Sequence, residues 1–543
     1  MDSQTVLTSP QTIGSSARRQ VIRLGAGVPP PTLRVVDWLI IAAASSALAW
    51  SCVVYSARRA FWYDEIFSWM MVSDRSLVHM MRSVAHAADD GGPLYYLLAW
   101  PWAHLFGSSE LSLRLFSTFG LIIALAVTWC TLRRSHGFRA TAFGALTTFC
   151  TSPLLLGQVA QARFYGLMTA LAALAVAVFA ATANTKTISR RLIVWTALAH
   201  ASLTLSHPLG ILYSGLVLAA LLVWDTLHRR WRPRAYVAIA SSWTVLLLWV
   251  RPFMRVAELG KPRGWIPMPT LSSLLSVYHL GSQLWLLLTL IALGTLSHTG
   301  VSAAETLPRQ TRDERKALAL VGFLIVQMPA VLYVLSHIAQ PLLVQRYLAP
   351  ASVGFAILFT QLASILEPRG GEDIISGVVY AVWVLLFIGL LAYPVIHARY
   401  SPPRDAANTA VEALVPHGVP IVVEDNHSFF PLLFYTRQQG RPYYFPLDWP
   451  LAISPQGSPQ APLVYKQLKI WKDLGYWSDR LTQSNELLCS FSEFAVIDSP
   501  GLLWFEERIT TRPDFEYQRT GSLREGTVWL VRWKKGAKPG FCQ

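Results

Sequence analysis

The sequence is organised around Phe61-Trp62-Tyr63-Asp64-Glu65-Ile66-Phe67-Ser68-Trp69, a stretch that follows the first long apolar run of the chain. Two adjacent carboxylates lie there among aromatic side chains. Carboxylates beside a membrane are costly and are usually kept for chemistry or for a charged partner. The alternative is a solvated helix at the membrane interface, whose aromatic side chains lie at the headgroups. The rest of the chain decides between these two interpretations.

The composition indicates a polytopic membrane protein. Of the 543 residues, 53% are hydrophobic and only 14% are charged, whereas about a quarter of a soluble chain is charged. The formal net charge is +15, but no basic stripe accompanies a nucleic-acid-binding motif, so nucleic acid is not an expected partner. Five cysteines without a CxxC motif exclude a disulfide-rich scaffold.

Apolar runs of a length that crosses a bilayer predict about eleven transmembrane helices. They cover residues 35–56, 110–132, 139–157, 164–183, 191–206, 209–227, 235–251, 274–296, 317–337, 346–366 and 374–396. The shorter apolar piece 93–106 is rich in Tyr and Trp, and we expect it to be an interfacial helix on the same side as Asp64.

Basic loops orient these spans. If the N-terminus is cytoplasmic and 93–106 does not span, the clearly basic loops 133–139, 184–191, 228–234 and 307–316 all face the cytoplasm, as the positive-inside rule requires. The C-terminus then lies outside. The outside loop 251–273 is also basic, which indicates either an anionic ligand or a local exception to the rule.

The chain therefore divides into three parts. Residues 1–34 are expected to be a disordered cytoplasmic tail. Residues 35–396 form the transmembrane domain, in which 57–109 is the first external loop. Residues 397–543 alternate strand-like and helix-like runs, which predicts an extracytoplasmic α/β domain.

Two cysteines, Cys489 and Cys542, occur in the C-terminal domain. In an oxidising compartment a disulfide between them would close a loop of about 50 residues and tie down the end of the chain. The alternative is two unpaired thiols. Cys52, Cys130 and Cys150 lie in predicted spans and are interpreted as packing residues.

Nearly every polar cluster suited to chemistry falls on the outside face. An enzyme there has lipid-linked activated compounds at hand. A sugar carried on polyprenyl phosphate needs a carboxylate base, which Asp64 supplies. It also needs groups that hold the leaving phosphate, which Arg163, His207 and Arg346 supply. The apolar spans supply a groove for the prenyl tail.

Each of these residues also has a simpler interpretation. Arg163 begins an apolar span and could reach toward the headgroups. His207 precedes a proline and could cap a helix. Arg346 could be an orientation signal, although it lies on the wrong side for one. The pair Asp89-Asp90 could form only a turn. Together on one face, the five clusters are more informative than any one alone.

Several motifs occur in order along the chain. They are Trp62-Tyr63-Asp64-Glu65, the run from Asp89 to Tyr96, the run from Leu105 to Ser117, Gln161-Ala162-Arg163-Phe164-Tyr165, and Arg346-Tyr347-Leu348. In these motifs the chain resembles the C-type (GT-C) glycosyltransferase superfamily, in particular bacterial enzymes similar to protein O-mannosyltransferases and to the lipid A aminoarabinose transferase. The resemblance covers residues 35 to about 350 and is thin over the C-terminal domain.

The resemblance implies an inverting glycosyltransferase with a polyprenyl-phosphate donor and an acceptor hydroxyl on the outer face of the bacterial cytoplasmic membrane. It implies the following roles: catalysis by Asp64 with Glu65 beside it, donor-phosphate binding by Arg163, Tyr165, His207, Arg346 and Tyr347, and a sugar or acceptor pocket that includes Asp89, Asp90, Tyr95 and Gln161. Two departures bear on the identity of the sugar: Gly91-Gly92 replaces the family's His-Pro, and Gln161 replaces a Glu.

The alternative function is a secondary transporter or a flippase of lipid-linked saccharides. Such a protein should carry internal repeats and charged or broken helices near the middle of the membrane, and the sequence has no repeat. We expect no cofactor and no essential metal, although Asp64, Glu65 and one of Asp89 or Asp90 could bind a hard cation. The expected partners are the lipid-linked donor, a lipid, polysaccharide or protein acceptor, and membrane lipids.

Overall fold

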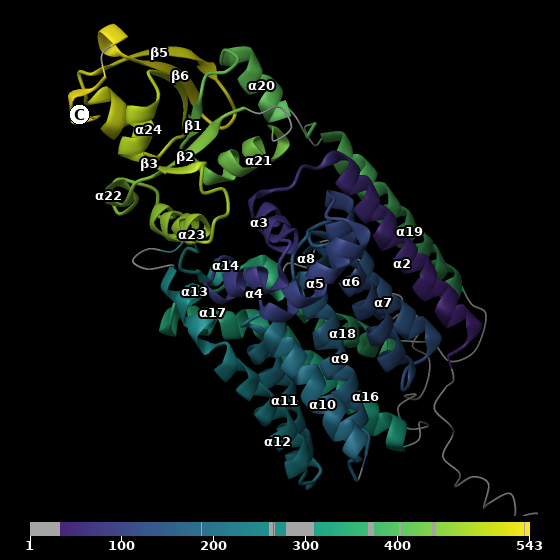
Figure 1. Ribbon diagram of the computed structural model, residues 1–543. Coiled ribbons are helices and arrows are strands. Elements are labelled where there is room, and N and C mark those ends of the chain that lie inside the picture. Colours follow the sequence, from purple (N-terminus) through teal and green to yellow (C-terminus); the bar gives the residue numbers. More distant parts are fainter. Residues whose placement is uncertain are drawn as a thin grey trace, which may run out of the picture.

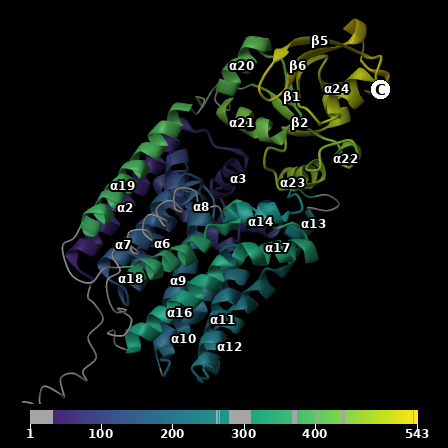
Figure 2. The ribbon, with the colours of Figure 1, turned by 180° about the vertical axis from the view of Figure 1, so that it is seen from behind.

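The computed structural model consists of a helical domain with a smaller α/β domain mounted on one end (Figures 1 and 2). It describes residues 33–185, 187–259, 264, 266–278, 309–366, 374–400, 403–404, 406–436, 441–536 and 538–542. The N-terminal tail at 1–32 and most of the predicted span at 274–296 lie outside the described residues.

The helical domain contains two groups of elements. The first is α2 (Val35–Arg58), α3 (Tyr63–Val72), α4 (Leu77–Ala85), α5 (Pro93–Phe106), α6 (Glu110–Arg133), α7 (Phe138–Thr151), α8 (Pro153–Leu156) and α9 (Tyr165–Asn184). The second is α10 (Arg190–Ser206), α11 (Gly210–Leu227), α12 (Pro233–Ser242), η1 (Trp243–Leu248), α13 (Val250–Leu259), α14 (Leu271–Val277), α16 (Arg309–Val326), α17 (Met328–Ile338), η3 (Gln345–Leu348), α18 (Ala351–Leu366) and α19 (Ile374–Tyr400).

Several helices fit a membrane protein. Among the described residues, five are long and apolar enough to cross a bilayer, and the pair Pro233–Leu248 and Val250–Leu259, bent by 68°, would add a sixth if it is one span. Helices α7, α10 and α18, where spans were predicted, are shorter, at 14, 17 and 16 residues. The total of eleven spans therefore stays a prediction.

Helices α6 and α9 cross with their backbones in contact. A Cβ atom on Gly166 would lie 1.9 Å from the carbonyl oxygen of Ser117, and one on Gly120 would lie 2.4 Å from the backbone of Gly166. Only glycine allows two helices to approach this closely. Ser117 Oγ then donates to the carbonyl oxygen of Arg163 at 2.7 Å, so the crossing fixes the loop that carries Arg163.

The C-terminal domain is a six-stranded sheet in the order β3-β2-β1-β4-β6-β5. Its strands are β1 (Ile421–Val423), β2 (Tyr443–Leu447), β3 (Leu481–Gln483), β4 (Glu493–Asp498), β5 (Phe515–Ser522) and β6 (Thr527–Trp533). The first four pair in parallel, and β6 runs antiparallel to both β4 and β5. The expected α/β domain is therefore present.

The helices of this domain link the parallel strands or lie beside the sheet (Figure 1). They are α20 (Ala406–Leu414), α21 (Asn426–Thr436), α22 (Trp449–Ala452), α23 (Ala461–Asp473) and α24 (Ser484–Ser490), with the short turns Glu506–Thr510, Lys534–Gly536 and Gly540–Cys542. The predicted disulfide is confirmed: Cys489 in α24 is bonded to Cys542, with Cα atoms 5.5 Å apart.

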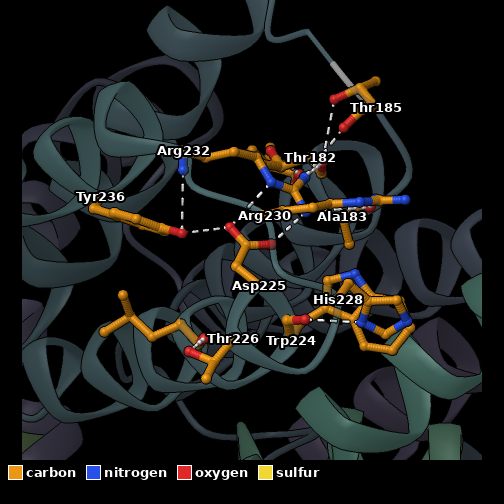
Figure 3. Close-up of polar contacts among 12 residues, drawn as sticks. Thr182, Ala183, Thr185, Trp224, Asp225, Thr226, His228, Arg230, Arg232 and Tyr236 are labelled. Carbon is orange, nitrogen blue, oxygen red and sulfur yellow. Dashed lines mark hydrogen bonds and ion pairs between the residues drawn. The ribbon is translucent and has the colours of Figure 1, made fainter.

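A buried ion pair between Arg232 and Asp225 ties the loop between α11 and α12 to α9 (Figure 3). Arg232 donates from Nε to Asp225 at 3.0 Å, and its guanidinium also contacts the carbonyl oxygens of Thr182 and Ala183 in the last turn of α9. Carbonyls at a helix C-terminus have no partner within the helix, and a cation there also stabilises the helix dipole. One arginine of the basic loop 228–234 therefore has a structural role in addition to any effect on orientation.

We predict that Asp225→Ala destabilises the protein by about 3–5 kcal/mol, because Arg232 would remain buried without a counter-charge. The double variant Asp225→Ala/Arg232→Met should recover much of this loss. Thermal unfolding in detergent, followed by tryptophan fluorescence, measures both effects, with the exposed Asp473→Ala as the matched control. Equal melting temperatures for Asp225→Ala and wild type would contradict a stabilising role for the pair.

Candidate active site

Glu65 joins three segments of the helical domain. Its carboxylate accepts from Arg114 Nε at 2.8 Å and Nη2 at 2.7 Å, and from the backbone N–H of Ala162 at 2.8 Å. It also accepts from the backbone N–H of Trp62 at 3.3 Å, which closes the N-terminus of α3. Glu65 and Arg114 are both fully buried.

The catalytic role that the resemblance implies for Glu65 stays a prediction, whereas its contacts show a structural role. Both of its oxygens are occupied by donors, and Arg114 additionally donates to the carbonyl oxygens of Arg59 at 2.8 Å and Ala60 at 3.0 Å. A carboxylate held in this way positions α3. Arg114 itself was missed as a site residue, although it stands in the motif between Leu105 and Ser117.

Asp64 is turned to a different side of α3 and remains accessible. Its carboxylate lies 3.5 Å from Arg346 Nη2, and 15% of the Asp64 side chain is exposed. Burial raises the pKa of Asp64, while the charges of Arg163 and Arg346 oppose this rise. Arg346 lies over the ring of Trp62, 5.4 Å from its centroid, as in a cation–π contact. The predicted base and one predicted phosphate ligand are therefore neighbours.

Arg163 lies at the centre of the acidic cluster. Its Nη1 donates to Asp89 at 2.7 Å, to Ser68 Oγ at 3.1 Å and to the Asp64 carbonyl oxygen at 3.2 Å, and its Nη2 is paired with Asp90. Only 1% of Arg163 is exposed. The guanidinium therefore does not reach toward headgroups. It is a fork between two carboxylates, a geometry that suits arginine.

Asp89 and Asp90 form an unequal pair. Burial raises the pKa of Asp89 to about 7 despite its bond to Arg163, and the Tyr96 hydroxyl donates to the same carboxylate. For Asp90, the charges of Arg163, His207 and Arg346 outweigh burial and lower the pKa to about 2. The Asp90 side chain is 31% exposed. The pair is thus more than a turn, and Asp90 is its ionised, open member.

The two glycines after Asp90 are explained by packing. A Cβ atom on Gly92 would lie 2.3 Å from the Leu205 carbonyl oxygen, and the backbone N–H of Gly92 donates to the Ser206 carbonyl oxygen at 3.1 Å. The departure from the family motif at this position therefore lets the loop lie directly against the end of α10.

Aromatic rings form one wall of the site. The His207 ring stacks on Phe164 at 4.5 Å and lies 5.2 Å from the ring of Tyr347. His207 Nδ1 accepts from the backbone N–H of Leu209 at 3.1 Å, and burial lowers the pKa of His207 to about 4. His207 is therefore neutral at pH 7, with its proton on Nε2 available as a donor. His207 can therefore cap the backbone through Nδ1 and contact a ligand through Nε2 at the same time.

The remaining predicted site residues separate into two groups. The Tyr165 hydroxyl and Gln161 Oε1 are buried and have no hydrogen-bond partner among the described residues, so both are available to a ligand. Tyr95 is instead enclosed by the rings of Tyr96, Phe116 and Phe164. It supports the wall and does not face a ligand.

No group of three or more His, Cys, Asp or Glu side chains within the described part of the chain is arranged to hold a metal ion. In the acidic cluster, the arginine fork of Arg163 occupies the space between Asp89 and Asp90.

The C-terminal domain covers α3, which sequence analysis did not anticipate. Tyr63 donates from its hydroxyl to Gln467 Oε1 at 3.2 Å, and Gln467 Nε2 donates to the Ala88 carbonyl oxygen at 3.2 Å. The backbone N–H of Phe61 donates to Tyr435 Oη at 2.6 Å. Two residues just before Asp64 are thus held by side chains more than 350 positions later.

No protein-family model and no curated protein sequence matches the chain. Solved structures do match it. ArnT from Cupriavidus metallidurans in the apo state superposes with a TM-score of 0.59 and 14% identity, over 93% of this chain and 100% of that chain. This chain has the ArnT fold. The structure of ArnT bound to undecaprenyl phosphate matches equally, with a TM-score of 0.59 and 15% identity over the same shares.

ArnT is a lipid A aminoarabinose transferase of the GT-C superfamily, so the predicted resemblance is confirmed at the level of the fold. The match also extends over the C-terminal domain, where the sequence motifs are thin. A further match is the archaeal oligosaccharyltransferase AglB from Archaeoglobus fulgidus in complex with an inhibitory peptide and a dolichol-phosphate. It has a TM-score of 0.44 and 10% identity, over 85% of this chain and 69% of that one.

We predict that Glu65→Ala lowers the stability of the fold by about 3–5 kcal/mol, since it leaves Arg114 buried without a counter-charge. Asp64→Asn should not lower it, because a carboxylate whose pKa burial has raised is less stable when ionised than a neutral amide. Thermal unfolding of the two purified variants in detergent separates the roles. Similar melting temperatures for Glu65→Ala and wild type would contradict the positioning role of Glu65.

Proposed function

We propose that the chain is an inverting glycosyltransferase that moves a sugar from a polyprenyl-phosphate donor to an acceptor hydroxyl. The observation that carries this proposal is the pairing of a partly accessible carboxylate of raised pKa, Asp64, with the guanidinium of Arg346 at 3.5 Å. The ArnT fold supports it, because ArnT has been solved with undecaprenyl phosphate.

Asp64 is the proposed general base. A base of raised pKa accepts a proton more readily, provided that it is still ionised at the working pH, and the charges of the two nearby arginines favour its ionised form. The acceptor oxygen loses its proton to Asp64 and forms a bond to the anomeric carbon. The bond from that carbon to the phosphate oxygen breaks, and polyprenyl phosphate leaves with the electron pair. A single displacement inverts the anomeric centre.

The leaving phosphate is assigned to Arg346, which keeps 22% of its side chain exposed. The buried donors Tyr165 Oη and Trp62 Nε1 lack partners among the described residues and can complete the contact. Arg163 is assigned a positioning role, because Asp89 and Asp90 already occupy its fork. The sequence-based expectation was that both arginines bind the phosphate directly; we now propose this role for Arg346 alone.

The proposed location is the bacterial cytoplasmic membrane, with the C-terminal domain outside. The disulfide between Cys489 and Cys542 suits an oxidising compartment. The basic loop 228–234 lies at the end of the helical domain away from the C-terminal domain (Figures 1 and 2), which suits a cytoplasmic position for that end.

We expect Asp64→Asn to reduce transfer by about 10²–10⁴-fold, because the amide keeps the shape and loses the base. The assay measures polyprenyl phosphate released from a lipid extract of the host membranes by mass spectrometry. Undecaprenyl phosphate should still bind the variant, and the exposed Asp473→Asn serves as the control. Wild-type turnover by Asp64→Asn would exclude a role as base.

We expect Arg346→Gln to raise the pH at which transfer activity is half lost on the acid side. Removing the positive charge removes one of the influences that lower the pKa of Asp64, so a higher pH is needed to ionise the base. The KM for the donor should rise by about 10–100-fold through loss of a charge-assisted contact, with partial recovery in Arg346→Lys. An acid limb and a donor KM that both match wild type would show that Arg346 contacts neither group.

A further inference from the structure

The C-terminal domain contains a cavity of about 660 Å³ that the proposed reaction does not use. Its wall includes the residues that directly follow three parallel strands: Glu424 after β1, Asp448 after β2, and Ser499 after β4. The chain leaves β1 toward β2 on one side and later adds β4 on the other side of β1. Such a switch in strand order opens a crevice at the carboxyl ends of the strands, where open α/β sheets bind ligands.

Glu424 gives this cavity an unused polar atom. The residue is only 5% exposed. Its Oε2 accepts from the backbone N–H of Ser499 at 3.4 Å, but Oε1 has no hydrogen-bond partner among the described residues. A buried polar atom without a partner is costly, and such atoms often await a ligand. Burial, together with the charges of Asp498 and Glu506, raises the pKa of Glu424 well above its usual range.

The lining identifies the class of ligand. Among the described lining residues there is no Lys or Arg, and the polar members are mainly carboxylates, amides and hydroxyls, with the imidazole of His427 on the side toward α3. Asp448 is already paired with Arg508, but Asp425 and Glu525 add negative charge. Phosphates and uronic acids would therefore be repelled. Groups that accept hydrogen bonds suit the hydroxyls of a sugar. The half-buried ring of Tyr465 suits the apolar face of the same sugar.

The cavity also adjoins the candidate active site. His427 lines it, and the His427 ring lies 4.8 Å from the ring of Tyr63, the residue before Asp64. A molecule that extends from the cavity past His427 therefore approaches the carboxylate of Asp64.

We infer that this cavity binds a hydroxyl-rich saccharide, uncharged or amine-bearing, as part of the acceptor. The assignment as acceptor rests on the proposed transferase function, whereas the binding of the saccharide does not.

The test is a printed array of neutral, amine-bearing and acidic oligosaccharides beside Ser/Thr-rich peptides, probed with the full chain in detergent. We expect binding to neutral or amine-bearing saccharides. Glu424→Gln and Tyr465→Ala should each weaken it by about tenfold, as expected for loss of one buried polar contact or one ring face. Glu486→Gln, an exposed acid of α24 away from the cavity, should bind as wild type does. Undecaprenyl phosphate binding, measured in parallel, should be unchanged in all three variants.

Binding only to acidic saccharides, only to peptides, or to no saccharide would overturn the inference. So would wild-type saccharide binding by both Glu424→Gln and Tyr465→Ala. The two variants act independently, so misfolding of one leaves the other as the test. If Asp64→Asn keeps full transfer while the cavity variants lose saccharide binding, the proposed function fails and the saccharide site stands.

Discussion

Arg114 is fully buried, and its guanidinium donates to both oxygens of Glu65 and to two backbone carbonyls just before α3. Taking two charges out of water costs several kcal/mol for each ion, and only good geometry with further hydrogen bonds offsets that cost. The backbone N–H of Ala162 supplies one of those bonds. The rotation of α3 about its axis is thereby set. Because Asp64 is the preceding residue of the same helix, fixing Glu65 also fixes the direction in which Asp64 points.

The two arginines near Asp64 are held to different degrees. Arg163 is 1% exposed and is fixed by two carboxylates, a hydroxyl and a backbone carbonyl. Arg346 lies on the short turn η3, keeps part of its surface, and rests on the ring of Trp62. The first arginine is enclosed by its partners, and the second presents part of its guanidinium side chain at the surface of the same acidic cluster.

Sequence analysis predicted which residues lie together at the candidate site, but not which contacts each of them makes. The motifs predicted that Asp64, Asp90, Arg163 and Arg346 lie close together, as the structure shows. Charged side chains are costly among apolar helices, so those at one face of a helix bundle gather there. It did not separate the surroundings of Glu65 from those of Asp64, since adjacent residues in a sequence look alike although successive helical residues point about 100° apart. The alternation of strand-like and helix-like runs sufficed to predict an α/β domain over residues 397–543. The contacts of Tyr435 and Gln467 with α3 depend on how two domains meet, which no local pattern encodes.

The hydrogen bonds between the segment around α3 and the side chains of Tyr435 and Gln467 also determine when, during synthesis of the chain, the site is completed. A chain is made from its N-terminus, and its domains generally fold as they emerge. The helix that carries Asp64 belongs to the earliest part of the chain, but its outer face is covered only when the last third has been made and folded. Under the proposed function, lipid-linked donors are present in the membrane into which the chain is inserted. Because the last domain to be made completes the site, an unfinished chain would not hydrolyse these donors.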